Sequence, residues 1–155
     1  MPKIELHTLR EINACGYPAP FNEIAKGRFR KRLGDAGGLS QFGVNLTRLE
    51  PGSASAQRHW HESEDEFVFI VSGQVVLIED EGETLFKAGD AAAFKAGVQN
   101  GHHLVNQSDR DVLYLEVGTR ALQERGDYPD IDMRFESRNG VVRFLHKDGT
   151  PYSTN

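Results

Sequence analysis

The chain has 155 residues, 38% of them hydrophobic and 26% charged, so it can bury one core and disorder is not expected. Its formal net charge of -5 at pH 7 argues against nucleic acid or an anionic membrane surface as the main partner. The single cysteine, Cys15, excludes an internal disulfide and a thiolate metal cluster, and it fits a reducing compartment.

The first ten residues contain no apolar run, so we expect no signal peptide. The longest apolar stretches, residues 67–71 and 75–78, are far shorter than the roughly 20 residues of a membrane helix. The sequence therefore predicts a soluble, cytoplasmic protein without a membrane partner.

The N-terminal quarter allows a short helical turn at Phe21–Ala25. The basic stretch Arg28–Arg32, interleaved with Phe29, suggests a nucleic-acid surface in isolation, but a solvated edge strand suits the acidic chain better.

Short segments rich in Val, Leu, Ile and Phe then alternate with turns that contain Gly, Asp or Asn. This pattern predicts an all-β sandwich or barrel. We expect turns at residues 49–52, 80–82 and 89–90. The expected strands are Phe42–Leu49, residues 66–71, 74–78, 84–86, Ala91–Phe94, 104–106 and 112–117.

After the predicted barrel, residues 120–125 allow a second helical stretch. The tail beyond Gly126 carries Pro129 and Pro151, and we expect it to be irregular apart from a strand at Val141–Leu145. We expect this tail to wrap the barrel or to contact a partner subunit, with disorder as the alternative.

Two of the six histidines form a His-x-His pair, His59 and His61. On a helix these side chains would point about 200° apart, whereas on a strand both face the same side. They would then lie about 6.6 Å apart along the backbone, so both imidazoles could reach one ion at about 2.1 Å. The pair is therefore a candidate chelate.

Glu66 and His102 are expected to complete the site from later strands. A carboxylate facing a barrel interior is costly unless it is paired or bound to metal. Three histidines and one glutamate suit one divalent ion, and the ligand types do not choose among Zn, Mn, Fe, Ni and Co. We expect His103 to point outward, because it alternates with His102. The alternatives are ordinary surface or hydrogen-bonded histidines, a Glu66 that does not bind metal itself, and His103 in place of His102 as the third imidazole.

These residues resemble the two cupin motifs. The first motif is matched by Gly52, His59, His61, Glu66 and Gly73, with six residues between Gly52 and His59 where five are usual. The second is matched by Gly89, Gly97, His102 and Asn106, with Lys95 at a position that is usually proline and four residues instead of two before His102. The chain is also similar to small cupins of unassigned function that are described as sugar-phosphate isomerase-like, through residues 101–106, 114–118 and 146–152.

The resemblance implies a double-stranded β-helix, or jelly-roll barrel, with few helical turns and with the metal inside. It implies one domain over residues 1–155, with a barrel core at about 42–119 and a wrapping tail at 120–155, and a homodimer.

Three functions follow as hypotheses. The first is a metal-dependent isomerase or epimerase of a small polyoxygenated or sugar-phosphate-like compound, with Glu116 and His103 as candidate bases and Arg58 or Lys95 as candidate phosphate ligands. The second is a mononuclear iron dioxygenase, and the third is a non-catalytic module that binds a small ligand.

Overall fold

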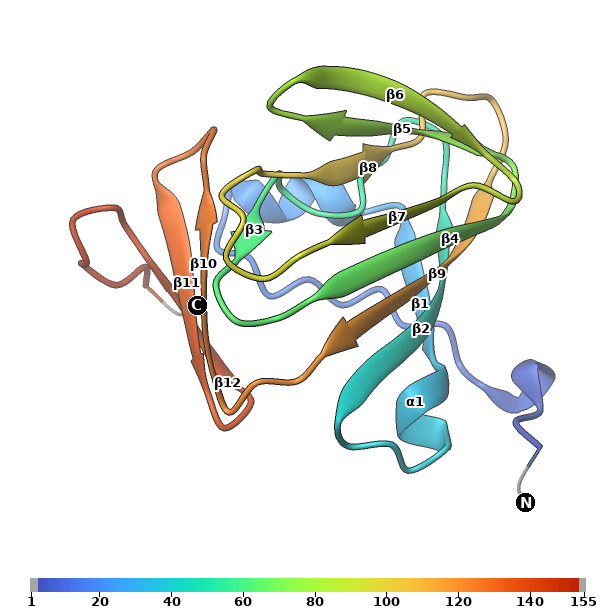
Figure 1. Ribbon diagram of the computed structural model, residues 1–155, viewed down its shortest axis with the longest axis horizontal. Coiled ribbons are helices and arrows are strands. Elements are labelled where there is room, and N and C mark those ends of the chain that lie inside the picture. Colours follow the sequence, from blue (N-terminus) through green and yellow to red (C-terminus); the bar gives the residue numbers. More distant parts are fainter. Residues whose placement is uncertain (1–2, 154–155) are drawn as a thin grey trace.

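The computed structural model describes residues 3–153 and contains three antiparallel sheets (Figure 1). The short helices are η1 (Leu6–Thr8), η2 (Phe21–Ala25) and α1 (Leu33–Ala36). The strands are β1 (Arg28–Arg32), β2 (Phe42–Leu49), β3 (Trp60–His61), β4 (Glu66–Ser72), β5 (Gln74–Glu79), β6 (Gly82–Lys87), β7 (Ala91–Phe94), β8 (His103–Val105), β9 (Val112–Thr119), β10 (Gln123–Tyr128), β11 (Met133–Arg138) and β12 (Val141–Leu145).

The largest sheet has five strands in the order β1-β2-β9-β4-β7. Its register places Arg30 beside Thr47, Thr47 beside Tyr114 and Tyr114 beside Ile70, so these residues form one row across four strands. Thr47, Tyr114 and Ile70 are all buried. Because side chains alternate along a strand, this row defines the inner face of the sheet.

The opposite wall is the small sheet β6-β5-β8 together with the chain that leads into β3. Isolated bridges join Ala54 to Val105 and His59 to His102, so the segment before β3 lies beside the segment that enters β8. The inner faces of the two sheets share one apolar core, which includes Leu49, Val68, Ile70, Val75, Leu77, Leu104, Val112 and Tyr114.

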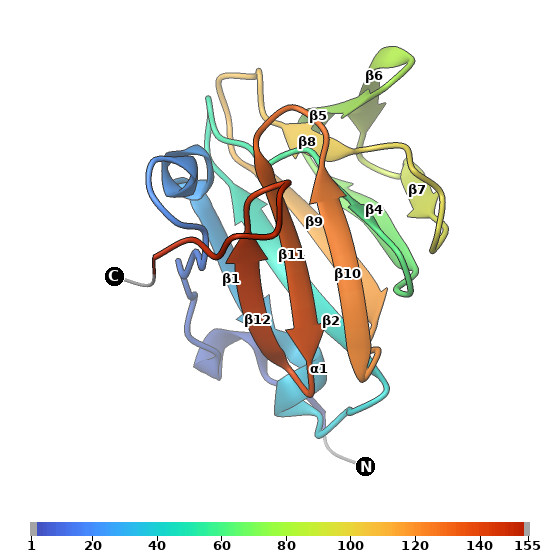
Figure 2. The ribbon, with the colours of Figure 1, turned by 90° about the vertical axis from the view of Figure 1, so that its left-hand side faces the viewer.

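The C-terminal segment forms a third sheet in the order β12-β11-β10-β3 (Figure 2). The strand predicted at Val141–Leu145 is confirmed, but the irregular tail and the helix at residues 120–125 are wrong. In β10 the buried positions alternate, as in a strand, but they are Glu124, Gly126 and Tyr128 rather than a run of apolar residues. Hydrophobic alternation along the sequence therefore does not reveal this strand.

Most other predicted elements are confirmed, with exact bounds for the helical turn Phe21–Ala25 and for the strands Phe42–Leu49 and Ala91–Phe94. The expected turns contain Gly52, Gly82 and Gly89, which all have positive φ. Arg28–Arg32 is an edge strand as predicted, but it is not solvated, because Arg28 is 6% exposed. Within residues 3–153, no helix is both long enough and apolar enough to cross a membrane.

Candidate metal centre

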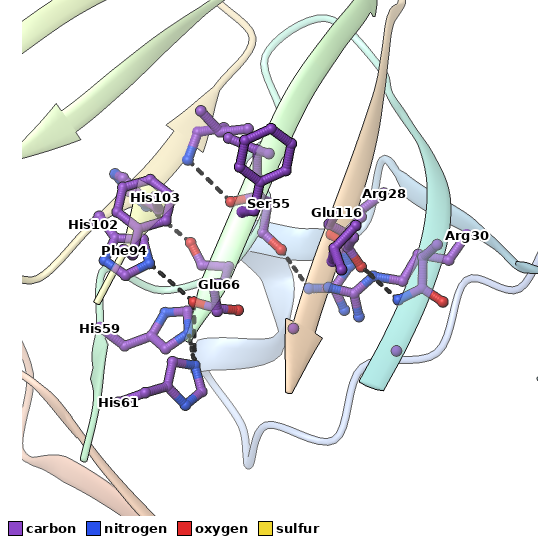
Figure 3. Close-up of a pocket in the computed structure, with 18 of the residues that line it drawn as sticks. Arg28, Arg30, Ser55, His59, His61, Glu66, Phe94, His102, His103 and Glu116 are labelled. Atoms are coloured by element: carbon purple, nitrogen blue, oxygen red, sulfur yellow. Dashed lines mark hydrogen bonds and ion pairs between the residues drawn. The ribbon is translucent and has the colours of Figure 1, made fainter. Parts of the chain in front are cut away.

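Four side chains meet where the three sheets converge (Figure 3). Glu66 is the first residue of β4, and its side chain faces the barrel interior like Val68 and Ile70 two and four residues later. His61 lies in β3, which pairs with β10, and the backbones of His59 and His102 are bridged to each other. The four residues therefore come from separate positions in the barrel wall, and backbone pairing holds each of them in place.

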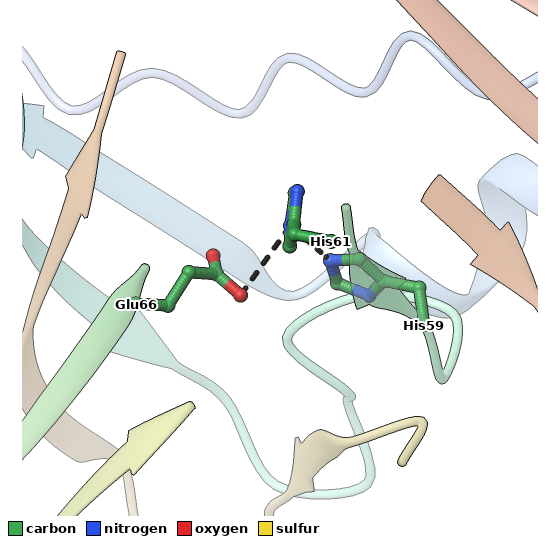
Figure 4. Close-up of side chains that lie close together, drawn as sticks. All are labelled: His59, His61 and Glu66. Atoms are coloured by element: carbon green, nitrogen blue, oxygen red, sulfur yellow. Dashed lines mark hydrogen bonds and ion pairs between the residues drawn. The ribbon is translucent and has the colours of Figure 1, made fainter. Parts of the chain in front are cut away.

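The donor atoms of His59, His61 and Glu66 form a compact group in which all three lie within 4.8 Å of one another (Figure 4). The Nε2 atoms of His59 and His61 are 3.1 Å apart, and His61 Nε2 is 3.3 Å from Glu66 Oε2. Two ligands at about 2.1 Å from one ion and at right angles to each other would be about 3.0 Å apart. The separations therefore fit adjacent ligands of one divalent ion.

His102 joins this group through the carboxylate. Its Nε2 atom lies 3.0 Å from Glu66 Oε2, although His102 is outside the compact group of three donors. The ring stacks on Phe94, with centroids 3.6 Å apart and planes 2° from parallel. This packing fixes the direction of the imidazole and points Nε2 at Glu66.

The remaining ring nitrogens face backbone oxygens or a carboxylate. His59 Nδ1 is 2.7 Å from the Gln57 carbonyl and His102 Nδ1 is 3.3 Å from the Asn100 carbonyl, so each Nδ1 is assigned as the donor. A proton on Nδ1 leaves the Nε2 lone pair free to bind a metal. Metal-binding histidines usually donate their other ring N–H to a backbone carbonyl or a carboxylate in this way. His61 Nδ1 is buried without a hydrogen bond, and Glu124 Oε1 is 3.7 Å away.

The electrostatics favour an ionised carboxylate beside a neutral imidazole. Burial by itself would raise the pKa of Glu66, but the hydrogen bond with His102 and the neighbouring histidines together lower it to about 2. Burial lowers the pKa of His59 to about 4. Burial also acts to lower the pKa of His61, but the carboxylates of Glu124, Glu66 and Glu64 outweigh it and raise that pKa. A metal ion would therefore find Glu66 and His59 already in their ligating protonation states.

The cluster opens into a cavity of about 560 Å³. Gly43 and Gly118 are paired in the register of β2 and β9, and both line the cavity next to Glu66. A Cβ atom on Gly118 would lie 3.7 Å from Glu66 Cγ. Gly118 thus places no side chain beside the carboxylate, which leaves room for a small ligand, whereas the Arg120 side chain lies over Gly43.

Comparisons with known proteins agree on the fold. A family model described as a cupin domain matches residues 45–118. A structure from Silicibacter pomeroyi, described as a sugar phosphate isomerase from a cupin superfamily, is 46% identical, with a TM-score of 0.95 over 99% of this chain and 98% of that chain. The chain belongs to the cupin superfamily.

Two further similar structures show how much the chemistry of this fold varies. A cupin from Acidithiobacillus ferrooxidans, provisionally described as a sugar phosphate isomerase, is 29% identical, with a TM-score of 0.75 over 84% of each chain. A polyketide cyclase from Streptomyces resistomycificus is 17% identical, with a TM-score of 0.63 over 77% of this chain and 79% of that chain, and it supports the fold alone. The search of curated proteins gave no match. The fold therefore does not decide the reaction, which has to be argued from the site.

The departures from the cupin motifs leave the site intact. The longer loop before His102 does not shift its register, because His59 and His102 exchange backbone hydrogen bonds of 3.2 and 2.9 Å. Asn106 is fully buried and donates to the carbonyls of Leu49 and Arg110, so it holds the barrel together rather than facing the cavity.

The two candidate bases of this cupin have different surroundings. Glu116 lines the cavity, and its Oε1 atom accepts a hydrogen bond from Asn45 at 2.9 Å and lies 2.6 Å from Arg30 Nε. His103 also lines the wall, but its Nδ1 is hydrogen bonded to the Ala56 carbonyl at 2.8 Å. The structure places His102, and not His103, beside Glu66.

The cavity includes basic residues that the sequence analysis did not assign to it. Arg28, Arg30, Arg32 and Arg120 line it, whereas Arg58 and Lys95, the candidate phosphate ligands, do not. Arg58 instead forms ion pairs with Asp130 and Asp80. Strand alternation places Arg28 and Arg30 on one face of β1, but this stretch was predicted to be a solvated edge strand.

Proposed function

We propose that this cupin is a metal-dependent isomerase or epimerase of a small polyoxygenated compound. The observation that carries the proposal is the set of converging donor atoms on His59, His61, Glu66 and His102, which opens into a cavity large enough for such a substrate. The similarity to cupins described as sugar phosphate isomerases supports the same class of reaction.

The four side chains fit a divalent metal, and the donor types are compatible with Zn, Mn, Fe, Ni or Co. When bound, such an ion would polarise a carbonyl group and an adjacent hydroxyl group of the substrate. Phe94 and the backbone acceptors behind His59 and His102 hold the imidazoles in position, so little reorganisation is needed on binding.

We assign proton transfer to Glu116 in preference to His103. Both contacts to Glu116 use Oε1, and no residue within the described range 3–153 donates a hydrogen bond to Oε2. That oxygen can accept a proton from a substrate carbon or hydroxyl group. Asn45 and Arg30 fix the orientation of the carboxylate while it does so.

The metal site is tested by elemental analysis of the purified protein. We expect stoichiometric metal in the wild type and its loss in the double variant His59→Ala/His61→Ala, with folding checked by circular dichroism. His7→Ala is the matched control, because His7 is exposed and far from the barrel in sequence, and it should keep full metal. Stoichiometric metal in the double variant would show that the ligands have been assigned wrongly.

The reaction is tested with sugar phosphates and related polyols in heavy water. Deuterium incorporation at a substrate carbon without oxygen uptake supports the isomerase. Oxygen consumption with iron-loaded protein would instead show a dioxygenase, and tight ligand binding without turnover in either assay would show a binding module.

We also propose that a second copy of the chain covers the outer face of β4. Phe67, Phe69 and Val71 point outward there and are 41%, 38% and 42% exposed, and they lie beside outward residues of β9. An exposed apolar sheet face of this kind is typical of an interface between identical subunits. Analytical ultracentrifugation should give a dimer for the wild type and a monomer for Phe69→Lys, and a wild-type monomer would contradict this proposal.

A further inference from the structure

The inner face of β1 carries arginine side chains into the barrel. Arg28 and Arg30 lie two residues apart and therefore share one face of the strand. In the register of the sheet, Arg30 lies beside Thr47, and Thr47 lies beside Tyr114 on β9. The row continues the inner face, so the side chains of Arg28 and Arg30 lie on the same face of the sheet as Tyr114.

Arg28 is a buried cation without an acidic partner. It is 6% exposed, and its guanidinium group donates to the carbonyl oxygens of Ser55 and Ala14. Within residues 3–153, no carboxylate forms a salt bridge with it. Carbonyl groups satisfy its hydrogen bonds, but they do not neutralise its charge.

Two buried hydroxyl groups on the strands next to β1 also lack ordinary hydrogen-bond partners. Arg30 Nε lies 2.6 Å from Glu116 Oε1, so this carboxylate already pairs with one nitrogen of Arg30. The hydroxyl groups of Tyr114 and Thr47, which are neighbours in the register of β9 and β2, are both buried and have no partner other than each other among the residues that the structure describes. Buried polar groups normally find partners, so a hydroxyl proton here is available to a bound acceptor.

The local charge has the sign that an anion requires. The guanidinium groups of Arg28 and Arg30 and the carboxylate of Glu116 together give a net charge of +1, in a chain whose net charge is -5. An uncompensated charge inside a barrel is unfavourable unless a counter-ion binds. This part of the cavity therefore favours a negatively charged ligand that carries hydrogen-bond acceptors.

This group of residues lies in the same cavity as the candidate metal centre. Arg28, Arg30, Tyr114 and Glu116 line it together with His59 and Glu66. Figure 3 shows Arg28, Arg30 and Glu116 on one side of the open space and the histidines with Glu66 on the other. A single small molecule could therefore contact both groups.

We propose that Arg28, Arg30 and Tyr114 form a subsite for an oxyanion of the substrate, either a phosphate or a carboxylate group. This inference depends on the proposed function in one respect only, which is that the rest of the substrate is assigned to the metal centre. Arg30 and Tyr114 donate to the anion, and Arg28 supplies the buried positive charge. The subsite restricts the substrate class to acids or phosphate esters and disfavours neutral polyols.

The test measures binding of inorganic phosphate, acetate and glycerol by isothermal titration calorimetry. It uses the full-length wild-type protein and, separately, the variant His59→Ala/His61→Ala. We expect phosphate or acetate to bind both proteins and glycerol to bind neither. The tighter of the two anions identifies the substrate group. Anion binding that disappears in the double variant would overturn the subsite, because the metal centre alone would then account for it. If the double variant still binds the anion but the wild type holds no metal, the proposed metal centre is wrong and the proposed anion subsite is supported.

Three substitutions test the residues themselves. Arg30→Gln removes one charge and one donor and should weaken anion binding about tenfold or more, and Tyr114→Phe should weaken it several-fold. Glu116→Gln removes the opposing negative charge and should strengthen binding several-fold, a gain that misfolding cannot produce. Arg110→Gln is the matched control, because the Arg110 side chain is 88% exposed, and it should leave binding unchanged. Unchanged affinity in both Tyr114→Phe and Glu116→Gln would overturn the proposal.

Discussion

The carboxylate of Glu124 lies directly behind the candidate metal ligand His61. Glu124 is 3% exposed, and its Oε1 atom is 3.7 Å from the buried His61 Nδ1, which has no hydrogen bond. The same carboxylate accepts the backbone N–H groups of Glu62 at 2.8 Å and Ser63 at 3.0 Å. Glu124 therefore holds the turn between β3 and β4 and faces the histidine from outside the cluster.

We predict that Glu124→Ala reduces both stability and metal affinity, and the two effects can be estimated separately. The Glu62 N–H group keeps a second acceptor, the Arg125 carbonyl at 2.8 Å, so only the Ser63 N–H group loses all its partners. The loss of a hydrogen bond to a charged acceptor corresponds to about 2 kcal/mol of unfolding free energy. Removal of a carboxylate behind a metal-binding histidine typically lowers metal affinity about 10- to 100-fold.

Urea denaturation of the metal-free protein measures the first effect, and competition with a chelator of known affinity measures the second. Glu136→Ala on the adjacent strand β11 is the control, because its side chain is 43% exposed and forms only a 3.7 Å ion pair with Arg125. We expect this control to change stability by less than about 0.5 kcal/mol and to leave metal affinity intact. If Glu124→Ala loses stability but binds metal as tightly as the wild type, the role assigned to Glu124 behind His61 is wrong.

Two further predictions concern protonation and packing. In the metal-free protein, side-chain NMR should show His59 neutral down to about pH 4, because burial lowers its pKa from 6.5. Since the folded-state pKa is the lower one, the stability of wild type relative to His59→Gln should be full above pH 6.5 and should decrease, by at most about 3 kcal/mol, as the pH falls through 4. Titration of His59 near pH 6.5 would contradict this. Gly126→Ala should destabilise the protein by about 3 kcal/mol or more, because its Cβ would lie 2.7 Å from the Trp60 carbonyl oxygen and would overlap the Phe135 ring. Thermal denaturation checks this against Gly16→Ala, whose Cβ would have only an ordinary 3.8 Å contact, and equal melting temperatures for the two variants would contradict it.

The sequence predicted those strands that are short apolar segments between turn residues. Residues 42–49 and 91–94 were predicted with their exact bounds for this reason. It also indicated that His59 and His61 could share one ion, because strand alternation alone places both imidazoles on one side. These are local properties, which depend on backbone geometry over a few residues.

The tertiary structure decided which polar residues face inward. Arg28 and Arg30 alternate with Phe29 and Lys31, and no local rule says which set points into a barrel. Pairing of β1 with β2 settles the direction, because it aligns Arg30 with Thr47 and buries Arg28. The loop that leads to His102 is a similar case, since only the bridge to His59 shows that His102 rather than His103 meets Glu66.

The strand β10 shows the same division between local pattern and long-range pairing. Its buried residues are a glutamate, a glycine and a tyrosine, and they are buried because β3, β11 and the turn at residues 62–63 surround them. Local sequence patterns, namely short apolar segments between turns and the spacing of two histidines on a strand, therefore indicated the barrel and the His-x-His pair. The inward arginines and the carboxylate behind His61 depend on partners 17 to 63 residues away, and only the assembled sheets bring these together.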